Sequence, residues 1–201
     1  MKMNNSNAVF TCLGSSNHTE RTRADYDYYA TAPRAVEELL KVESFSPRVW
    51  ECACGEGHIS EVLFEHGYDV LSTDLIDRGY KKQIGTFDFL QDNVVDENTY
   101  DIITNPPYKH AAEFVERALE ISRGGTKIAM LLKIQFLESE RRGRLFDENP
   151  PKRIWVARKR LNTARNGDFD NFGSGSAMLF AWFVWEKGFK GKPTIDWINK
   201  E

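Results

Sequence analysis

Short apolar runs alternate with longer amphipathic segments between residues 48 and 134. The runs are bounded by Gly, Pro or Asn and predict strands at 48–54, 68–73, 100–104 and 127–134. Segments 58–66 and 111–121 carry apolar residues at helical spacing. Because strands joined through helices pair in parallel, we expect an α/β fold: a doubly wound, mostly parallel sheet with helices on both faces.

The pattern is less regular on either side of this core. Residues 1–24 are polar and predict a loosely ordered N-terminal arm, and 25–201 is expected to form a single domain. A first helix is predicted over 33–42, with Pro33 in its first turn and Thr31 as a capping candidate. Later elements are expected as a helix at 136–146, strands at 153–157 and 177–185, and a C-terminal antiparallel hairpin partner at 194–198. The stretch 136–176 is expected to be irregular and basic, with a mobile loop at 161–176.

Composition sets limits on partners and compartment. The chain has 201 residues, 41% of them hydrophobic, which suits one globular domain. A net charge of −3 gives no overall attraction to nucleic acid or anionic membrane, and no run approaches the roughly 18–20 apolar residues of a membrane span. The three cysteines (Cys12, Cys52, Cys54) lack a second ligand pair, so we expect no metal. An odd, low cysteine count without a secretion signal favours the cytoplasm. Oligomeric state is left open.

The strand predicted at 100–104 leads directly into Asn105-Pro106-Pro107-Tyr108. Each proline holds its φ at about −65° and lacks an N–H, so the segment stays extended and some of its carbonyls remain outside the sheet ladder. An amide oxygen, a backbone carbonyl and an aromatic face are therefore expected to meet in one small volume. That combination suits a planar ligand bearing an amino group.

Further polar residues follow the other predicted strands. The turn Glu51-Cys-Ala-Cys-Gly55-Glu-Gly57 lets backbone approach a ligand at a helix N-terminus; a plain structural turn is the alternative. Asp74 ends the second strand, where an acid can accept hydrogen bonds from ribose; a solvated loop acid or a helix cap is the alternative. Asp88, between two phenylalanines, is either simple alternation or a partner for an adenine amino group. Carboxyl ends of parallel strands line one crevice, so these residues are expected to converge.

This set of residues, in this order, resembles the S-adenosylmethionine-dependent amino methyltransferases with an Asn-Pro-Pro-Tyr signature, most of which act on N6 of adenine in DNA. The resemblance covers roughly residues 25–135. More narrowly, 13–18, 27–31 and 50–57 look like small methyltransferases encoded by phages and prophages. This narrower resemblance implies the cytoplasm of a bacterial or phage-infected host cell.

The resemblance implies a Rossmann-like class I methyltransferase fold with S-adenosylmethionine as cofactor. It places the segment 29–33 against the methionine carboxylate, the glycine turn beneath the methionine part, Asp74 on the ribose and Asp88 on the adenine. The cofactor-binding residues expected on this basis are Tyr29, Thr31, Pro33, Glu51, Gly55, Gly57, Asp74, Leu75, Asp88, Phe89 and Asn105.

The tetrapeptide also predicts a mechanism. An exocyclic amine conjugated to a purine is a poor nucleophile, and Asn105 with the Pro106 carbonyl can accept both of its hydrogens and localise the lone pair. Tyr108 would stack on the target ring and stabilise developing positive charge. Asn105 is neutral and cannot act as a general base, so our hypothesis is that the amine proton leaves to solvent after methyl transfer. The predicted catalytic residues are Asn105, Pro106, Pro107 and Tyr108.

The chain as a whole is slightly acidic, but a local excess of positive charge lies between residues 141 and 165. This stretch favours phosphate contacts and a nucleic-acid partner, which we expect to be DNA. An adenine in duplex DNA would have to flip out to reach the site, and 161–176 is the candidate to close over it. A solvated basic face is the alternative. The predicted nucleic-acid-binding residues are Arg141, Arg142, Arg144, Lys152, Arg153, Arg158, Lys159, Arg160 and Arg165.

Other functions remain open at this stage. A protein-glutamine methyltransferase would use the same acceptors for an amide, but the basic stretch has no role in it. RNA methylation is not separated from DNA methylation by phosphate contacts. A non-catalytic module that only binds the cofactor is disfavoured by the intact Asn105–Tyr108 segment beside an intact glycine turn.

Overall fold

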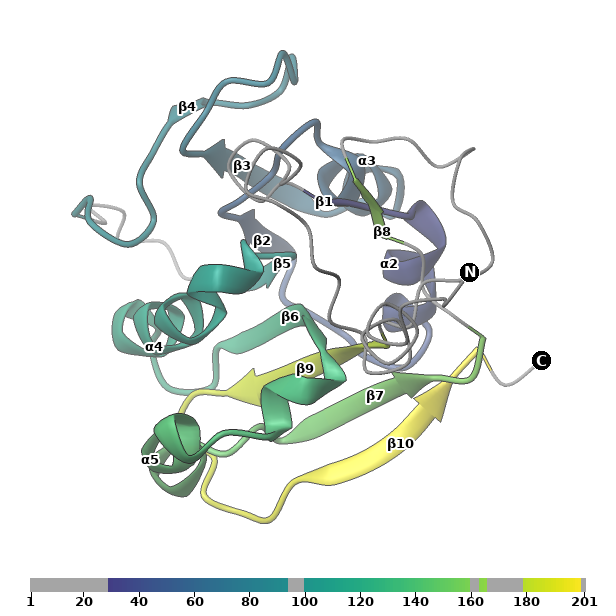
Figure 1. Cartoon of the computed structure of the whole chain (residues 1–201). Helices are drawn as coiled ribbons and strands as arrows, with labels where there is room; N and C mark the ends of the chain where they lie inside the picture. Colours follow the sequence, from purple (N-terminus) through teal and green to yellow (C-terminus); the bar gives the residue numbers. More distant parts are fainter. Residues whose placement is uncertain (1–28, 94–99, 160–162, 166–178, 200–201) are drawn as a thin grey trace, which may run out of the picture.

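A computed structural model describes residues 29–93, 100–159, 163–165 and 179–199. Its centre is an eight-stranded sheet of order β10-β7-β9-β6-β5-β2-β3-β4 (Figure 1). The strands are β2 (Arg48–Glu51), β3 (Asp69–Asp74), β4 (Gly85–Thr86), β5 (Asp101–Thr104), β6 (Lys127–Lys133), β7 (Arg153–Ala157), β9 (Phe180–Glu186) and β10 (Thr194–Ile198). Strands β2 to β6 pair in parallel, whereas β9 runs antiparallel to both β6 and β7. The predicted strands at 48–54, 68–73, 100–104 and 127–134 are confirmed in existence, with shorter bounds.

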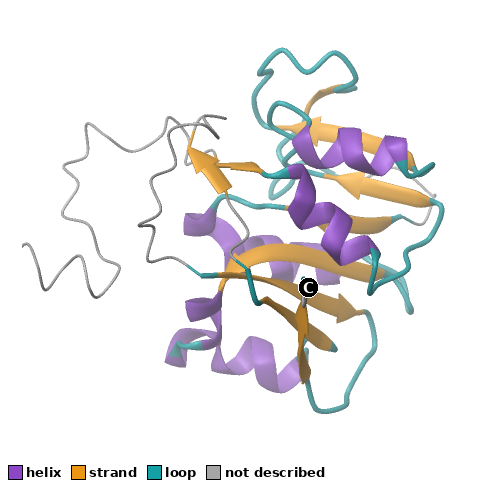
Figure 2. Ribbon diagram, turned by 90° about the vertical axis from the view of Figure 1, so that its right-hand side faces the viewer, coloured by secondary structure: helices purple, strands orange, loops and turns teal. Residues whose placement is uncertain are grey.

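Helices cover both faces of the sheet (Figure 2). On one face α2 (Pro33–Leu40) and α3 (His58–Glu65) bury Leu39 and Leu63 against strand residues such as Trp182. On the other face α4 (Ala111–Ile121) buries Phe114 against residues such as Phe183, and α5 (Gly143–Glu148) adds Leu145 to the same cluster. This arrangement confirms the predicted doubly wound α/β fold. It arises because successive side chains of a strand point to opposite faces of the sheet, and both faces are apolar.

The predicted pairing of 194–198 with 177–185 is wrong. β10 pairs in parallel with β7, with Ile195 opposite Ile154, and β7 lies between β10 and β9. The reason lies in β9, a buried strand that is already paired along one edge with β6 and along the other with β7. An antiparallel pair does close the C-terminal part of the sheet, but β7 and β9 form it.

The helix predicted at 136–146 is also wrong in its extent. The chain forms two 3₁₀ turns, η4 (Ile134–Leu137) and η5 (Glu140–Arg142), before α5 begins at Gly143. Arg142 donates hydrogen bonds to the carbonyls of Phe136 and Glu138, both at 2.8 Å. A side chain therefore satisfies carbonyls that a continuous helix would pair with backbone N–H groups.

A separate two-stranded antiparallel sheet joins distant parts of the chain. It pairs β1 (Tyr29–Thr31) with β8 (Thr163–Arg165), with Tyr29 opposite Arg165 and Thr31 opposite Thr163. Figure 1 shows β8 lying beside β1, next to α2. Neither strand is predicted from the sequence, and β8 falls inside the expected mobile loop 161–176, most of which lies outside the described residues. The predicted arm 1–24 lies outside them as well.

Candidate functional site

A cavity of about 310 Å³ opens at the carboxyl ends of β2, β3 and β5. Segments that follow these three strands line it, together with the end of β1 and the stretch around Asp88. The predicted site residues that line this cavity are Thr31, Glu51, Asp74, Leu75, Asp88, Phe89, Asn105, Pro106 and Pro107. Residues spread over more than seventy positions of sequence thus meet at one edge of the sheet, as parallel strand ends require.

The two glycines of the turn, Gly55 and Gly57, lie in sequence between residues that line the cavity. Gly55 and Gly57 have φ values of 56° and 86°, in the left-handed region that favours glycine. A Cβ on Gly57 would lie 2.2 Å from the ring of Tyr80, so the absence of a side chain makes room for that tyrosine. Gly55, Gly57 and Pro33 are not among the lining residues, and their predicted contact with a cofactor stays a prediction.

Asp74 is held rigidly at the end of β3. Its carboxylate accepts hydrogen bonds from the backbone N–H of Gly55 at 2.8 Å and of Ile76 at 3.0 Å, and the residue is 9% exposed. A carboxylate has about four lone-pair sites, so two backbone donors leave room for ligand hydroxyls. The glycine turn and the strand end are therefore joined through one side chain that also borders the cavity.

Glu51 is the most deeply buried acid of the cavity wall. It accepts a hydrogen bond from the Ser60 hydroxyl, which lies 2.7 Å from the Ser72 hydroxyl. Burial raises the pKa of the Glu51 carboxyl well above its usual range, and the nearby Asp74 carboxylate acts in the same direction against the Ser60 hydrogen bonds. Burial thus favours the neutral form of this carboxyl, and a cation bound beside it would lower its pKa again.

Asp88 and Phe89 have different environments. Asp88 caps its own turn, because its carboxylate accepts the Leu90 N–H at 2.9 Å. Phe89 is 2% exposed and stacks on Phe114 with ring centroids 5.0 Å apart, with Trp50 edge-on at 5.2 Å. The aromatic ring is therefore part of the core as well as the cavity wall.

The Asn105–Tyr108 segment forms the far wall. Asn105 donates from Nδ2 to the Thr31 hydroxyl at 3.0 Å. Pro107 accepts the N–H of His110 at 2.9 Å, and this bond closes the 3₁₀ turn η3 (Tyr108–His110) that leads into α4. Thr31 does not cap α2 as predicted: the N-cap is Ala32, and no side chain bonds there.

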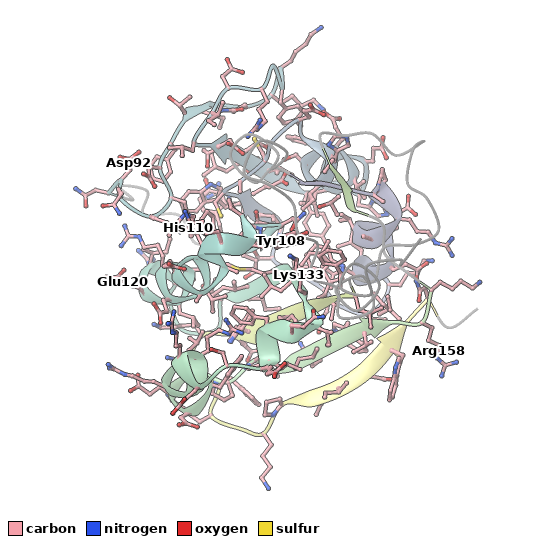
Figure 3. The ribbon with its side chains drawn as sticks, viewed as in Figure 1. Asp92, Tyr108, His110, Glu120, Lys133 and Arg158 are labelled. Carbon is pink, nitrogen blue, oxygen red and sulfur yellow. The ribbon has the colours of Figure 1, made fainter. Side chains whose placement is uncertain are left out.

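Tyr108 belongs to a second cavity of about 190 Å³. The ring contacts Phe180, with centroids 5.5 Å apart, and the Lys133 ammonium lies 4.7 Å from the ring centroid. Figure 3 shows Lys133 next to Tyr108, with His110 nearby on the same segment. The remaining lining residues are Ala111, Leu132, Gln135, Phe136 and Arg142. The two cavities share no lining residue, and the Asn105–Tyr108 segment borders both.

The predicted basic residues that the structure describes have different environments. Several are engaged within the fold: Arg142 holds backbone carbonyls, Lys152 pairs with Glu186 at 2.6 Å, Arg144 pairs with Glu148 at 2.8 Å, and Arg153 pairs with Glu43. Burial raises the pKa of Glu43, but hydrogen bonds from Arg153 and Trp155 outweigh it and leave that pKa lowered.

The other basic residues lie elsewhere. Arg141 is exposed in η5, just before α5. Arg158 and Lys159 are exposed just after the end of β7, and Figure 3 labels Arg158 there. Arg165 ends β8, beside β1, and Arg160 lies outside the described residues. At about 3.3 Å per residue, β7 separates Arg153 at its start from Arg158 just beyond its end by roughly 15 Å.

Other residues that line the larger cavity were not predicted as site residues from the sequence. They include Cys52, Cys54, His58, Ile76, Arg78 and His110. Burial raises the pKa of both thiols, so Cys52 and Cys54 serve as small apolar wall residues. Their place within the turn 51–57 was the available clue, because the wall lies between the glutamate and the glycines.

Solved structures share this fold at low sequence identity. A candidate class I S-adenosylmethionine-dependent methyltransferase of Listeria monocytogenes is similar over 94% of this chain and 70% of its own, at 14% identity and a TM-score of 0.58. A predicted O-methyltransferase of Agrobacterium tumefaciens covers 83% and 85%, at 13% identity and a TM-score of 0.57. A candidate RNA methyltransferase of Pyrococcus horikoshii covers 92% and 99%, at 15% identity and a TM-score of 0.55.

No protein-family model and no curated protein matches the sequence. The structural neighbours therefore establish the Rossmann-like class I methyltransferase fold, as predicted. Within the described part of the chain, no helix has the length and apolar character of a membrane span. The same residues hold no cluster of His, Cys, Asp and Glu side chains suited to a metal ion.

Proposed function

We propose that this protein is an S-adenosylmethionine-dependent methyltransferase that acts on an exocyclic amino group, and that its acceptor is N6 of adenine in DNA. The observation that carries the proposal is the position of the Asn105–Tyr108 segment between two cavities. Such a segment can meet a methyl donor on one side and an amine on the other. Two cavities bordered by one segment, with an amide on one side and an aromatic ring on the other, suit the methylation of an amine.

The larger cavity fits the cofactor in size and in donor chemistry. Small-molecule sites commonly measure about 300–1,000 Å³ and combine apolar walls with few polar groups. Asp74 is fixed to accept ribose hydroxyls, and Asp88 and Phe89 border the region expected for adenine. Glu51 lies deep in the wall, at a place suited to the methionine ammonium. When bound, S-adenosylmethionine supplies a methyl group on an electrophilic sulfonium.

Residues of the tetrapeptide would prepare the amine. Asn105 borders the larger cavity and can accept one amino hydrogen through its side-chain oxygen, while the Pro106 carbonyl accepts the other. Both hydrogen bonds draw the nitrogen toward a tetrahedral shape and localise its lone pair. Holding the reacting atoms about 3 Å apart supplies much of the remaining rate gain. No side chain needs to act as a base, since the proton leaves after transfer.

The second cavity favours a flat ring as acceptor. Its walls include the aromatic side chains of Tyr108 and Phe136, and the Arg142 guanidinium lies 4.6 Å from the Phe136 ring centroid. An aromatic base stacks on such walls, whereas the flexible side chain of glutamine would leave them poorly packed. A purine is therefore a better fit than a protein amide.

A nucleic acid is favoured over a free base by the neighbouring basic segment. β8 brings Arg165 to the strand that carries Thr31, and Arg141 and Arg158 remain exposed for phosphate contacts. DNA is proposed as the acceptor because the tetrapeptide resembles that of amino methyltransferases that mostly act on N6 of adenine in DNA, and because 13–18, 27–31 and 50–57 resemble small phage methyltransferases. RNA is the second candidate, and the structural similarity to the candidate RNA methyltransferase of Pyrococcus horikoshii is the observation that favours it.

The proposal is tested by calorimetry followed by transfer of a radiolabelled methyl group. Titration with S-adenosylmethionine should release heat at a single site, and label should then appear in DNA when DNA, RNA and protein are offered in parallel. Label in RNA alone would change the acceptor but keep the chemistry. Heat without transfer to any acceptor would leave only a cofactor-binding module, and no heat would remove the cofactor assignment.

A further inference from the structure

We propose that Thr31 is a positioning residue that holds the Asn105 amide in its productive orientation. The inference rests on the proposed function, because it concerns the group that would accept the target amine. It adds a residue on β1, far from Asn105 in sequence, to the working parts of the site. It also links that residue to the basic segment through β8.

The contact between the two side chains is direct and buried. Asn105 Nδ2 lies 3.0 Å from the Thr31 hydroxyl, across 74 positions of sequence, and Thr31 is 2% exposed. Both residues line the larger cavity. A hydrogen bond at that distance and burial restrains the amide, since breaking it would leave a polar group without water to replace the partner.

Orientation matters because the two ends of an amide have opposite hydrogen-bonding character. The target amine donates hydrogens and can be bound only by the amide oxygen. With Nδ2 held on Thr31, the oxygen lies at the other end of the planar group. A rotation of 180° would present Nδ2 to the amine, and two donors would then face each other. Thr31 therefore occupies the end of the amide that the amine cannot use.

The backbone around Thr31 shows that its hydroxyl is not needed for helix capping. Although the residue stands just before a helix opened by proline, the N-cap is Ala32 and makes no side-chain hydrogen bond. Thr31 instead ends β1, which is paired along its length with β8. The sheet fixes the backbone that carries the hydroxyl, so the side chain can hold Asn105 from a stable base.

The pairing of β1 with β8 joins amide positioning to the basic segment. Thr31 stands opposite Thr163, and Tyr29 stands opposite Arg165. A nucleic acid that contacts this segment would act on the same small sheet that presents Thr31. If the Asn105 amide is held less firmly, we expect methyl transfer to slow more than the binding of the cofactor or of the nucleic acid weakens.

The test compares Thr31→Val, which removes only the hydroxyl, with Thr31→Ser, which keeps it. We expect Thr31→Val to lower kcat on the order of tenfold to hundredfold, in line with the cost of small misplacements at a reacting centre. Its affinity for S-adenosylmethionine, measured by calorimetry, should change less than threefold, and Thr31→Ser should restore most of kcat. An equal fall in cofactor affinity and kcat/KM would overturn the proposal, because Thr31 would then act through the cofactor.

Thr73→Val is the matched control. Thr73 is a buried threonine on β3 whose hydroxyl accepts a hydrogen bond from Trp50 Nε1 at 2.9 Å, and it does not line the cavity. It should lose stability as Thr31→Val does, yet keep kcat. An equal loss of kcat in both variants would assign the effect to stability alone.

A second readout does not depend on activity. The side-chain amide of Asn105, assigned in ¹⁵N spectra by its absence from Asn105→Ala, should shift and exchange faster with solvent in Thr31→Val. Thr73→Val should leave it unchanged. An unmoved Asn105 signal in Thr31→Val would disprove the positioning role even if no acceptor is turned over, and wild-type inactivity with a shifted signal would fault the proposed function alone.

Discussion

The sequence predicts functional residues in two places: at the edge formed by β2, β3 and β5, and along the basic stretch 141–165. The fold arranges these two sets differently. At the sheet edge, residues distant in sequence converge on one cavity. Along the basic stretch, neighbours in sequence separate into ion pairs, backbone braces and exposed arginines. Topology explains the difference: parallel strands end on the same side, whereas charges along an irregular chain have no common direction.

The largest effect is expected at the tetrapeptide. Asn105→Ala should lower methyl transfer by about 10²–10³-fold, the usual cost of one preorganised hydrogen-bonding group, while cofactor affinity changes little. Single-turnover transfer together with calorimetry separates these quantities. Asn93→Ala, at an exposed asparagine that does not line the cavity, serves as the control. Transfer at the wild-type rate in Asn105→Ala would remove the residue from the mechanism.

The next largest effect should be a loss of stability at Arg153, the residue of the basic stretch that pairs with Glu43. Glu43→Gln removes the charge that pairs with Arg153 and should lower the free energy of unfolding by about 3 kcal/mol, as expected when a buried ion pair loses one partner. Urea denaturation measures it. Arg144→Ala, which breaks only the exposed pair with Glu148, should change stability by less than about 1 kcal/mol. Equal losses of unfolding free energy in the two variants would contradict the distinction between the buried pair and the exposed pair.

The same glutamate predicts a pH dependence. The folded pKa of Glu43 is lowered relative to its ordinary value of 4.5, so the stabilisation it provides is present above that value. It is lost as the pH falls through the lower folded pKa. Wild-type unfolding free energy should therefore fall more steeply below about pH 4.5 than that of Glu43→Gln. Parallel slopes in the two proteins would show that Glu43 is not the group responsible.

A moderate effect is expected at the ribose acid. Asp74→Asn keeps the shape of the side chain but removes its charge and one acceptor, and should weaken S-adenosylmethionine binding by roughly tenfold to a hundredfold. Asp69→Asn is the matched control at the other end of β3, where the carboxylate pairs with Arg48 on the surface. Unchanged affinity in Asp74→Asn would mean that the cavity edge does not hold the cofactor as proposed.

The smallest effect should come from the exposed arginines. Arg158→Ala should weaken DNA binding by a few-fold and reduce the salt dependence by about one counterion, without change in stability. Arg153→Ala should instead lower stability, because that side chain is engaged with Glu43. Fluorescence anisotropy at several salt concentrations separates the two. A salt slope altered by Arg153→Ala and not by Arg158→Ala would reverse the assignment of roles.

Much of the fold follows from local patterns in the sequence. Apolar runs and glycine turns predict the parallel strands and the helices of the core, since both depend on periodicity and on short connections. The pairing of 194–198 was wrong because strand order depends on which edges of β9 are already filled. Strands β1 and β8 were missed because a three-residue strand has no periodicity to detect.

The candidate site, like the fold, could be predicted only in part. Asp74 and Asn105 could be placed because Asp74 ends β3 and Asn105 directly follows β5, and topology fixes the position of residues at strand ends. The bond between Thr31 and Asn105 could not, since it depends on tertiary contacts between distant segments. The engagement of Arg142 and Arg153 was hidden for a similar reason: charge is visible in a sequence, but the partner of a charge is not.

The most direct test of the central claim is nucleoside analysis of DNA after incubation with the protein and S-adenosylmethionine carrying a deuterated methyl group. The account predicts that mass spectrometry finds the labelled methyl on N6 of deoxyadenosine, and that Asn105→Ala yields almost none. Unlabelled deoxyadenosine with intact cofactor binding, or label confined to another base, would contradict it.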